Sequence, residues 1–191
     1  VWTQGFGNYL AEQGARGKIH VVGPILWYLA SSSNEKKISR EAIVVFDVTP
    51  FNRESAEKMG LTYNYYRPEN VLAFINDIIA ARDAIASENH RRLPIIIKHK
   101  RTFSPSHDKE YLNLIEDARK KGTVITVPTE TNIRSLILEA AVVVVIPYSS
   151  PAYVAAELKI PAIYYDPTRE IIPTHESDPN IFFVAGVQAL K

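Results

Sequence analysis

The sequence alternates short, almost wholly apolar runs with longer segments of helical period, and this alternation constrains the fold more than any other feature. The runs are predicted strands at residues 42–48, 94–99, 123–127, 142–147 and 161–165. Nearly all of them are apolar throughout, as in a parallel sheet covered on both faces. The predicted helices lie between the strands, at residues 68–88, 107–121, 131–140 and 151–158. The pattern predicts an α/β fold, an open parallel sheet with helices on both faces and right-handed crossovers.

A chain of 191 residues has the length of one domain. Residues 1–41 are predicted to be a lead-in and linker, in which 18–24 adds an edge strand or belongs to an interdomain connection, and 31–41 is polar. The main body is expected over residues 42–191. Because the sequence starts with Val1 rather than methionine, we expect it to be one piece of a longer protein.

Composition excludes several functions. The chain has no cysteine, which rules out disulfides, thiol catalysis and thiolate zinc sites. With 22 Lys and Arg against 21 Asp and Glu, it lacks the basic surplus of a nucleic-acid binder. No apolar run is long enough for a membrane span, and the first residues do not resemble a signal peptide, so a cytoplasmic location is expected. The histidines show no metal spacing, and no metal site is predicted.

Ligands of open α/β sheets bind beyond the carboxyl ends of the strands, so the residues that follow each strand are the candidates for a site. A basic cluster follows the second predicted strand and two serines open the helix after the fourth. A helix start, hydroxyls and cations together favour a phosphate. The competing interpretation is that Ser150 only caps its helix and that the basic residues form a solvated loop. The candidate binding residues are Lys98, His99, Lys100, Arg101, Pro128, Thr129, Glu130, Tyr148, Ser149 and Ser150.

Two carboxylates also follow strands. Asp47 and Asp166 could act as a base or bind a ribose hydroxyl, although turn formation is the commoner role, especially for Asp166 before Pro167. The sequence contains neither GxGxxG nor GxxxxGK[ST], which disfavours a dinucleotide fingerprint and a P-loop. It assigns no catalytic residue.

The segment PYSSPAYVAAELKIPAIYYDP (147–167), preceded by TVPTETNIRSLILEAAVVVVI, resembles the C-terminal nucleotide-sugar-binding half of GT-B glycosyltransferases of bacterial surface-polysaccharide assembly, including lipopolysaccharide. The likeness covers roughly residues 18–185. It implies a Rossmann-like domain that is one half of an enzyme, with a nucleotide sugar as donor and no other cofactor. An N-terminal acceptor-binding domain would supply the other half and much of the catalytic machinery. Association with the inner face of the membrane through the full-length protein is compatible with this resemblance.

Within that fold, Ser149 and Ser150 are similar to the hydroxyl pair that holds the CMP phosphate in bacterial sialyl and Kdo transferases. The His-Pro motif of those enzymes is only half present, because Lys100 follows His99. A phosphate held by hydroxyls, a helix start and cations needs no metal to stabilise the leaving nucleotide. The segment 128–132 is a candidate for binding the base or the ribose of the nucleotide. The alternatives are a non-catalytic Rossmann-like interaction module and a GT-B epimerase acting on a UDP-sugar.

Overall fold

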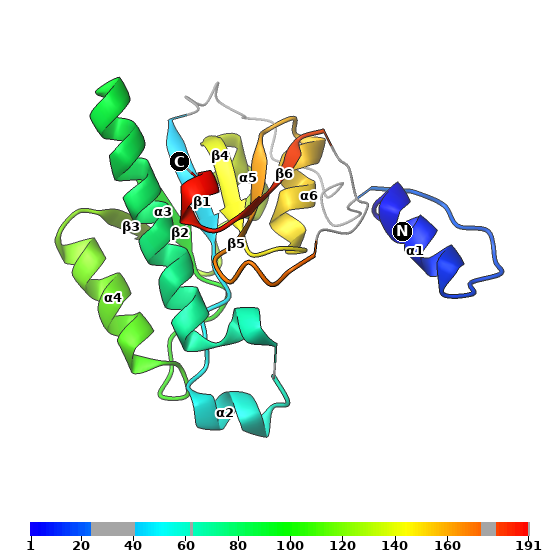
Figure 1. Cartoon of the computed structure of the whole chain (residues 1–191), viewed down its shortest axis with the longest axis horizontal. Coiled ribbons are helices and arrows are strands. Elements are labelled where there is room, and N and C mark those ends of the chain that lie inside the picture. Colours follow the sequence, from blue (N-terminus) through cyan, green and yellow to red (C-terminus); the bar gives the residue numbers. More distant parts are fainter. Residues whose placement is uncertain (24–40, 62, 173–178, 191) are drawn as a thin grey trace.

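The computed structural model describes residues 1–23, 41–61, 63–172 and 179–190. Its centre is a six-stranded sheet, parallel throughout, in the order β3-β2-β1-β4-β5-β6 (Figure 1). The strands are β1 (Ala42–Phe46), β2 (Ile95–Lys98), β3 (Val124–Val127), β4 (Ala140–Val145), β5 (Ala162–Asp166) and β6 (Ile181–Ala185). This is the Rossmann-like strand order, and the predicted α/β fold is confirmed.

The strand order reverses at the centre of the sheet. From β1 the chain builds outward to β2 and β3, then returns to place β4 on the other side of β1. Val44 of β1 lies between Ile96 of β2 and Val143 of β4. In such sheets the crevice outside the carboxyl ends of the two central strands is the usual ligand position.

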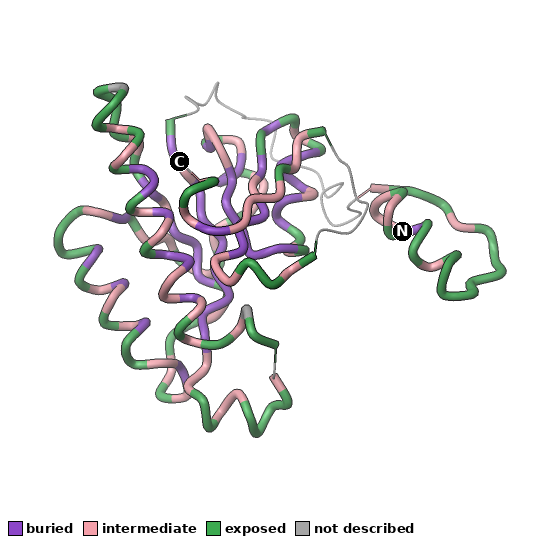
Figure 2. The backbone as a smooth tube through the Cα atoms, in the orientation of Figure 1, coloured by how far each residue is buried: buried purple, intermediate pink, exposed green. Residues whose placement is uncertain are grey.

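Helices cover both faces of the sheet. One face packs against α3 (Pro68–Asn89), α4 (Lys109–Lys120) and α7 (Val187–Leu190), and the other against α5 (Ile133–Leu138) and α6 (Ser150–Glu157). Successive strand residues alternate between the faces, since side chains of a strand point to opposite sides. Val45 and Ile97 therefore belong to the first core and Val44 to the second. Figure 2 shows the strands as the buried centre of the molecule.

Side-chain caps fix several helix starts. Asp108 precedes α4 and accepts a hydrogen bond from the Tyr111 N–H at 2.9 Å. Asn132 precedes α5 and accepts one from the Ser135 N–H at 3.1 Å. Each cap satisfies a backbone donor that the helix itself leaves unpaired.

The structure corrects the prediction at several positions. Residues 18–23 form no strand: the Val22 N–H donates to the Val1 carbonyl, and the Val1 amino group donates to the His20 carbonyl. The sixth strand is instead β6, which the sequence analysis missed. Residue 24 and the predicted linker, apart from Glu41, lie outside the described residues. Additional short helices are α2 (Arg53–Lys58) and the 3₁₀ turn η2 (Asn64–Tyr66) between β1 and α3.

The helix α1 (Gln4–Glu12) lies apart from the sheet in Figure 1. Its neighbour Trp2 meets Tyr153 of α6 edge to face, with ring centroids 6.5 Å apart. Among the described helices, none combines the length and the hydropathy that a membrane crossing requires.

The central strands should carry most of the stability. Replacing Ile97, which is fully buried, by alanine should lower the free energy of unfolding by about 2–5 kcal/mol through lost contacts and a cavity. Ile125 on the edge strand β3 is 52% exposed, and its replacement by alanine should cost less than about 1 kcal/mol. Urea unfolding of both variants measures the difference, and equal losses would contradict this placement of the core.

Candidate functional site

Two strained residues mark the carboxyl edge at the centre of the sheet. Thr49, after β1, has φ 48°, and Tyr148, after β4, has φ 64°. Left-handed backbone is costly for β-branched and bulky residues and persists only where surrounding contacts enforce it. Both lie where the strand order reverses. The edge at which ligands bind in this fold class thus contains backbone strain at both central strands.

The carboxylate of Asp47 joins the loops that follow β1 and β2. Its Oδ1 accepts hydrogen bonds from the Thr49 hydroxyl at 3.1 Å and from the Lys100 N–H at 3.0 Å. The Thr49 hydroxyl oxygen in turn accepts from the N–H groups of Lys100 at 3.0 Å and Arg101 at 3.2 Å. Three hydrogen bonds of its hydroxyl thus accompany the left-handed conformation of Thr49 and are contacts that can offset its strain.

The other carboxylate oxygen of Asp47 holds two aromatic groups. The His99 Nδ1 lies 3.0 Å from Oδ2 and the Tyr111 hydroxyl of α4 donates to the same oxygen. The imidazole is buried, and the Phe103 ring lies 4.6 Å from it between centroids. Within the described part of the chain, His99 Nε2 has no hydrogen-bond partner. His99 thus belongs to the interior of the edge, where it holds the loop in place.

The predicted basic cluster is divided between the two faces of the sheet, because successive residues of a strand point to opposite sides. His99 faces α4, whereas Lys98 points to the face covered by α5 and α6, where its Nζ donates to the Thr129 carbonyl at 2.7 Å. The Thr129 hydroxyl donates to Glu130 at 2.7 Å and lowers the pKa of that carboxyl, with a smaller contribution from the charge of Lys98. The structure therefore brings Lys98, Thr129 and Glu130 together.

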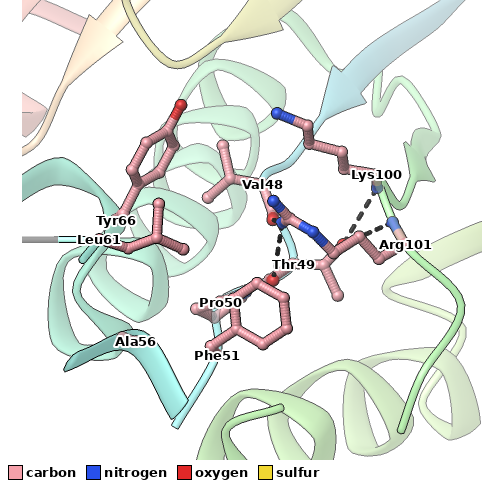
Figure 3. A pocket seen from close by; sticks show the side chains of 9 residues that line it. All are labelled: Val48, Thr49, Pro50, Phe51, Ala56, Leu61, Tyr66, Lys100 and Arg101. Atoms are coloured by element: carbon pink, nitrogen blue, oxygen red, sulfur yellow. Dashed lines mark hydrogen bonds between the residues drawn. The ribbon is translucent and has the colours of Figure 1, made fainter. Parts of the chain in front are cut away.

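Lys100 and Arg101 border a pocket of 140 Å³ on the opposite side of the edge (Figure 3). The Arg101 Nη1 donates to the Thr49 carbonyl at 3.3 Å and to the Val48 carbonyl, and the guanidinium lies over the Phe51 ring at 4.7 Å from its centroid. Desolvation lowers the pKa of Lys100, as does the neighbouring charge of Arg101. The remaining lining residues are Pro50, Ala56, Leu61 and Tyr66.

His107 packs against Phe51, one of the residues that line this pocket. Its ring stacks on Phe51 with centroids 4.9 Å apart and an interplanar angle of 12°. Its Nδ1 accepts the Ser104 N–H at 2.9 Å, a bond that requires the neutral tautomer with the proton on Nε2. Burial lowers the pKa of His107, and the charge of Arg101 lowers it further. Arg101, Phe51 and His107 thus form one stack.

Ser149 and Ser150 open α6 after β4. Ser149 occupies the N-cap position, yet its hydroxyl makes no capping hydrogen bond. The reason is local: Pro151 has no N–H, and the Ala152 N–H donates to the Ser149 carbonyl instead. Ser150, predicted as the cap, is the first helical residue and is exposed. Tyr148 is anchored by its hydroxyl on the Ile172 carbonyl at 3.3 Å.

Asp166 proves to be a turn-forming residue. Its Oδ1 accepts the N–H and the hydroxyl of Thr168 at 2.8 and 2.6 Å, and its Oδ2 accepts the Ile171 N–H at 2.9 Å. It is completely buried, so both oxygens are committed to the loop. The turn role favoured for Asp166 is confirmed.

The structure groups the predicted site residues in three places. Lys98, Pro128, Thr129 and Glu130 lie at the ends of β2 and β3. Lys100 and Arg101 lie at the pocket lined by Phe51. Tyr148, Ser149 and Ser150 follow β4, which lies on the other side of β1 from β2. The sequence analysis missed Phe51 and His107, because their stacking depends on an isolated bridge between distant segments. In the described residues, no group of three His, Asp or Glu side chains gathers as metal ligands would.

Fold and site together define a Rossmann-like α/β domain with a basic pocket and an uncapped helix start at its carboxyl edge. The chain belongs to the family of polysaccharide biosynthesis PFTS motif proteins, which it matches over residues 1–191. No match was found among curated proteins or among solved structures. Family membership indicates a role in polysaccharide biosynthesis.

The missing side-chain cap at the start of α6 can be tested by comparing the stability of two variants. Replacing Asp108 by alanine removes a formed cap and should lower the free energy of unfolding by about 1 kcal/mol. Replacing Ser149 by alanine removes no cap and should change it by less than about 0.5 kcal/mol. Denaturant unfolding at neutral pH compares them, and an equal loss for Ser149→Ala would show that its hydroxyl does cap the helix.

The burial of His107 in this stack predicts how the stability of the protein depends on pH. The pKa of His107 lies below the roughly 6.5 of an unfolded histidine, so as the pH falls the unfolded chain takes up the proton first. The stability present above that value is lost as the pH falls through the lower folded pKa. Between about pH 7.5 and about pH 5.5, His107→Gln should lose less stability than the unsubstituted chain. An NMR titration midpoint of His107 at or above about 6.5 would contradict the burial of its ring.

Proposed function

We propose that this chain is the donor-binding domain of a glycosyltransferase of the GT-B fold that builds a surface polysaccharide, and that it holds the phosphate of a nucleotide sugar without a metal. The observation that carries the proposal is the Ser149 hydroxyl, which stands at a helix start without capping it. A serine in that position normally binds the backbone of its own helix. Here the hydroxyl is available to a ligand, at the end of the sheet where ligands bind.

The name of the family supports a functional role for the segment that contains Ser149. Residues Pro147-Tyr148-Ser149-Ser150 correspond to the four letters of the PFTS motif, with tyrosine in place of phenylalanine and serine in place of threonine. The segment 50–53 shares only the first two letters. We infer that 147–150 is the motif position in this chain. The strained backbone of Tyr148 is in keeping with a ligand-binding turn.

A second group of residues faces the same side of the edge. Lys98 ends β2, and Ser149 follows β4, two strands further along the sheet, where the spacing of neighbouring strands separates β2 from β4 by about 10 Å. Lys98 is buried and held by Thr129, so its charge is fixed in place. In this proposal Lys98 supplies countercharge to the phosphate, and Glu130 accepts a hydrogen bond from a ribose hydroxyl.

The chemistry that this arrangement serves is glycosyl transfer. The bond between the anomeric carbon and the phosphate oxygen breaks, and its electron pair stays on the nucleotide, while an acceptor oxygen bonds to the sugar and gives up its proton. Donors fixed around the leaving phosphate stabilise the charge that develops there. The base that takes the proton belongs, in this proposal, to an acceptor-binding domain. In this proposal the donor is a CMP-linked sugar, as the likeness of Ser149 and Ser150 to CMP-dependent transferases implies, with a UDP-sugar as the alternative, and the location is cytoplasmic.

Nucleotide titration tests the site. CMP and UDP, followed by amide NMR or calorimetry, should perturb residues 147–152 at millimolar concentration. The double variant Ser149→Ala, Ser150→Ala should bind the preferred nucleotide about 5- to 150-fold more weakly, as expected for lost charge-assisted hydrogen bonds.

Ser87→Ala is the matched control, since that hydroxyl bonds to the Ala84 carbonyl within α3, near the end of α3 that precedes β2. Its nucleotide affinity should stay unchanged. If neither nucleotide binds, or if the double variant binds as well as the control, the phosphate site is wrong. Epimerised sugar in place of transferred sugar would favour an epimerase, and protein binding with indifference to nucleotides would favour an interaction module.

A further inference from the structure

The pocket beside Arg101 is separate from the helix start at Ser149 and has its own chemistry. Its volume of 140 Å³ is well below the roughly 300 Å³ at which pockets begin to enclose drug-sized ligands. A cavity of about 150 Å³ accommodates a single six-membered ring. The pocket is therefore too small for a whole nucleotide sugar, and it has room for one ring and its substituent.

The Arg101 side chain is fixed before any ligand arrives. The Thr49 and Val48 carbonyls hold Nη1, and the Phe51 ring supports the guanidinium plane. Within the described residues, both side-chain hydrogen bonds of Arg101 come from Nη1. Nε–H and Nη2–H lie side by side on another edge of the guanidinium, the fork that binds a carboxylate or a phosphate through two parallel bonds.

The cations at this pocket have no direct ion-pair partner among the described residues. In the part of the chain that the structure describes, neither Arg101 nor Lys100 forms an ion pair with an acidic side chain. The neighbouring carboxylate of Asp47 is buried and already accepts hydrogen bonds on both oxygens. Among the described residues, two adjacent cations therefore border the pocket without a direct ion pair, and the charge of Asp47 affects the pKa of Lys100 less than the opposing charge of Arg101 does. A bound anion would offset the repulsion between the two cations.

The opposite wall is apolar. Leu61 and Tyr66 lie on the side of the pocket away from the Arg101 backbone, and Pro50 lines it beside Phe51 (Figure 3). A mostly apolar lining with a small number of convergent polar groups is typical of small-molecule sites. A ring with an anionic substituent matches both walls, because its carbon–hydrogen face can pack on the apolar side while the anion meets the fork.

We propose that this pocket binds an acidic sugar unit, with a carboxylate or phosphate substituent on the Arg101 fork and Lys100, and the sugar ring against Pro50, Leu61 and Tyr66. The ligand is a saccharide recognised through its charge, as part of a donor or of a growing chain. The proposal rests on membership of a polysaccharide biosynthesis family and does not use Ser149 or Ser150.

Titration of the full chain with single sugars tests this. The probes are glucuronate for the carboxylate, glucose 1-phosphate for the phosphate, neutral glucose, and acetate as an anion without a ring. At least one acidic sugar should perturb the amides of 48–51 and 100–101 and bind at least tenfold more tightly than glucose and acetate. The tighter of the two acidic sugars identifies the anionic group.

Variants locate the binding. Arg101→Lys keeps the charge but loses the fork, and should weaken the acidic sugar tenfold or more. Ala56→Phe should block the pocket without touching either cation. Lys121→Gln, which removes a charge at the end of α4 near the opposite edge of the sheet, should have no effect. Circular dichroism and urea midpoints check that each variant is folded.

Several outcomes would overturn the proposal: no binding of either acidic sugar, glucose or acetate binding as tightly as the acidic sugars, or equal affinity of Arg101→Lys and Lys121→Gln. The Ser149→Ala, Ser150→Ala variant separates this pocket from the phosphate site. It should retain the acidic sugar while losing the nucleotide, so either site can fail alone. Loss of both ligands in that variant would contradict a separate pocket.

Discussion

The Asp47 carboxylate is the interaction on which the carboxyl edge depends. A buried carboxylate is costly unless donors surround it, and here Thr49, Lys100, His99 and Tyr111 do so from the loop after β1, the end of β2 and α4. These bonds hold Thr49 in its left-handed conformation and bring Arg101 to the Val48 carbonyl. One buried carboxylate thus links the loop after β1, which lines the pocket, to the chain beyond β2.

The alternation of side chains along a strand explains why adjacent basic residues lie in different environments. Lys98 and His99 are neighbours in sequence but point to opposite faces of the sheet, Lys98 toward the Thr129 carbonyl and His99 toward Tyr111. Arg101 lies beyond the strand and stacks on Phe51. One short basic segment thereby contributes to a proposed nucleotide site, an internal network and a separate pocket.

Much of the fold was predictable because its strands are apolar enough to identify a buried parallel sheet. Strand β6 was missed although all five of its residues are apolar, because no segment of helical period was identified between residues 165 and 181, and the alternation of strands and helices that marked the other strands therefore stops at residue 165. At the site, Lys98 and the serines could be located from strand ends alone. The stack of Arg101, Phe51 and His107 could not, since it joins segments whose contact is tertiary. His107 carried only the pattern of a residue next to a helix cap.

The hydroxyl of Ser149 has an evolutionary consequence. In the described residues this hydroxyl caps no helix, so selection for stability gives little reason to retain it, and under the proposed function the ligand supplies that reason. After gene duplication, one copy could lose this group by a single codon change and still accumulate as a well-folded protein. Under the proposed function, folded paralogues that no longer bind the nucleotide should therefore arise easily in such a lineage, and the residue at this position would distinguish them from binding members.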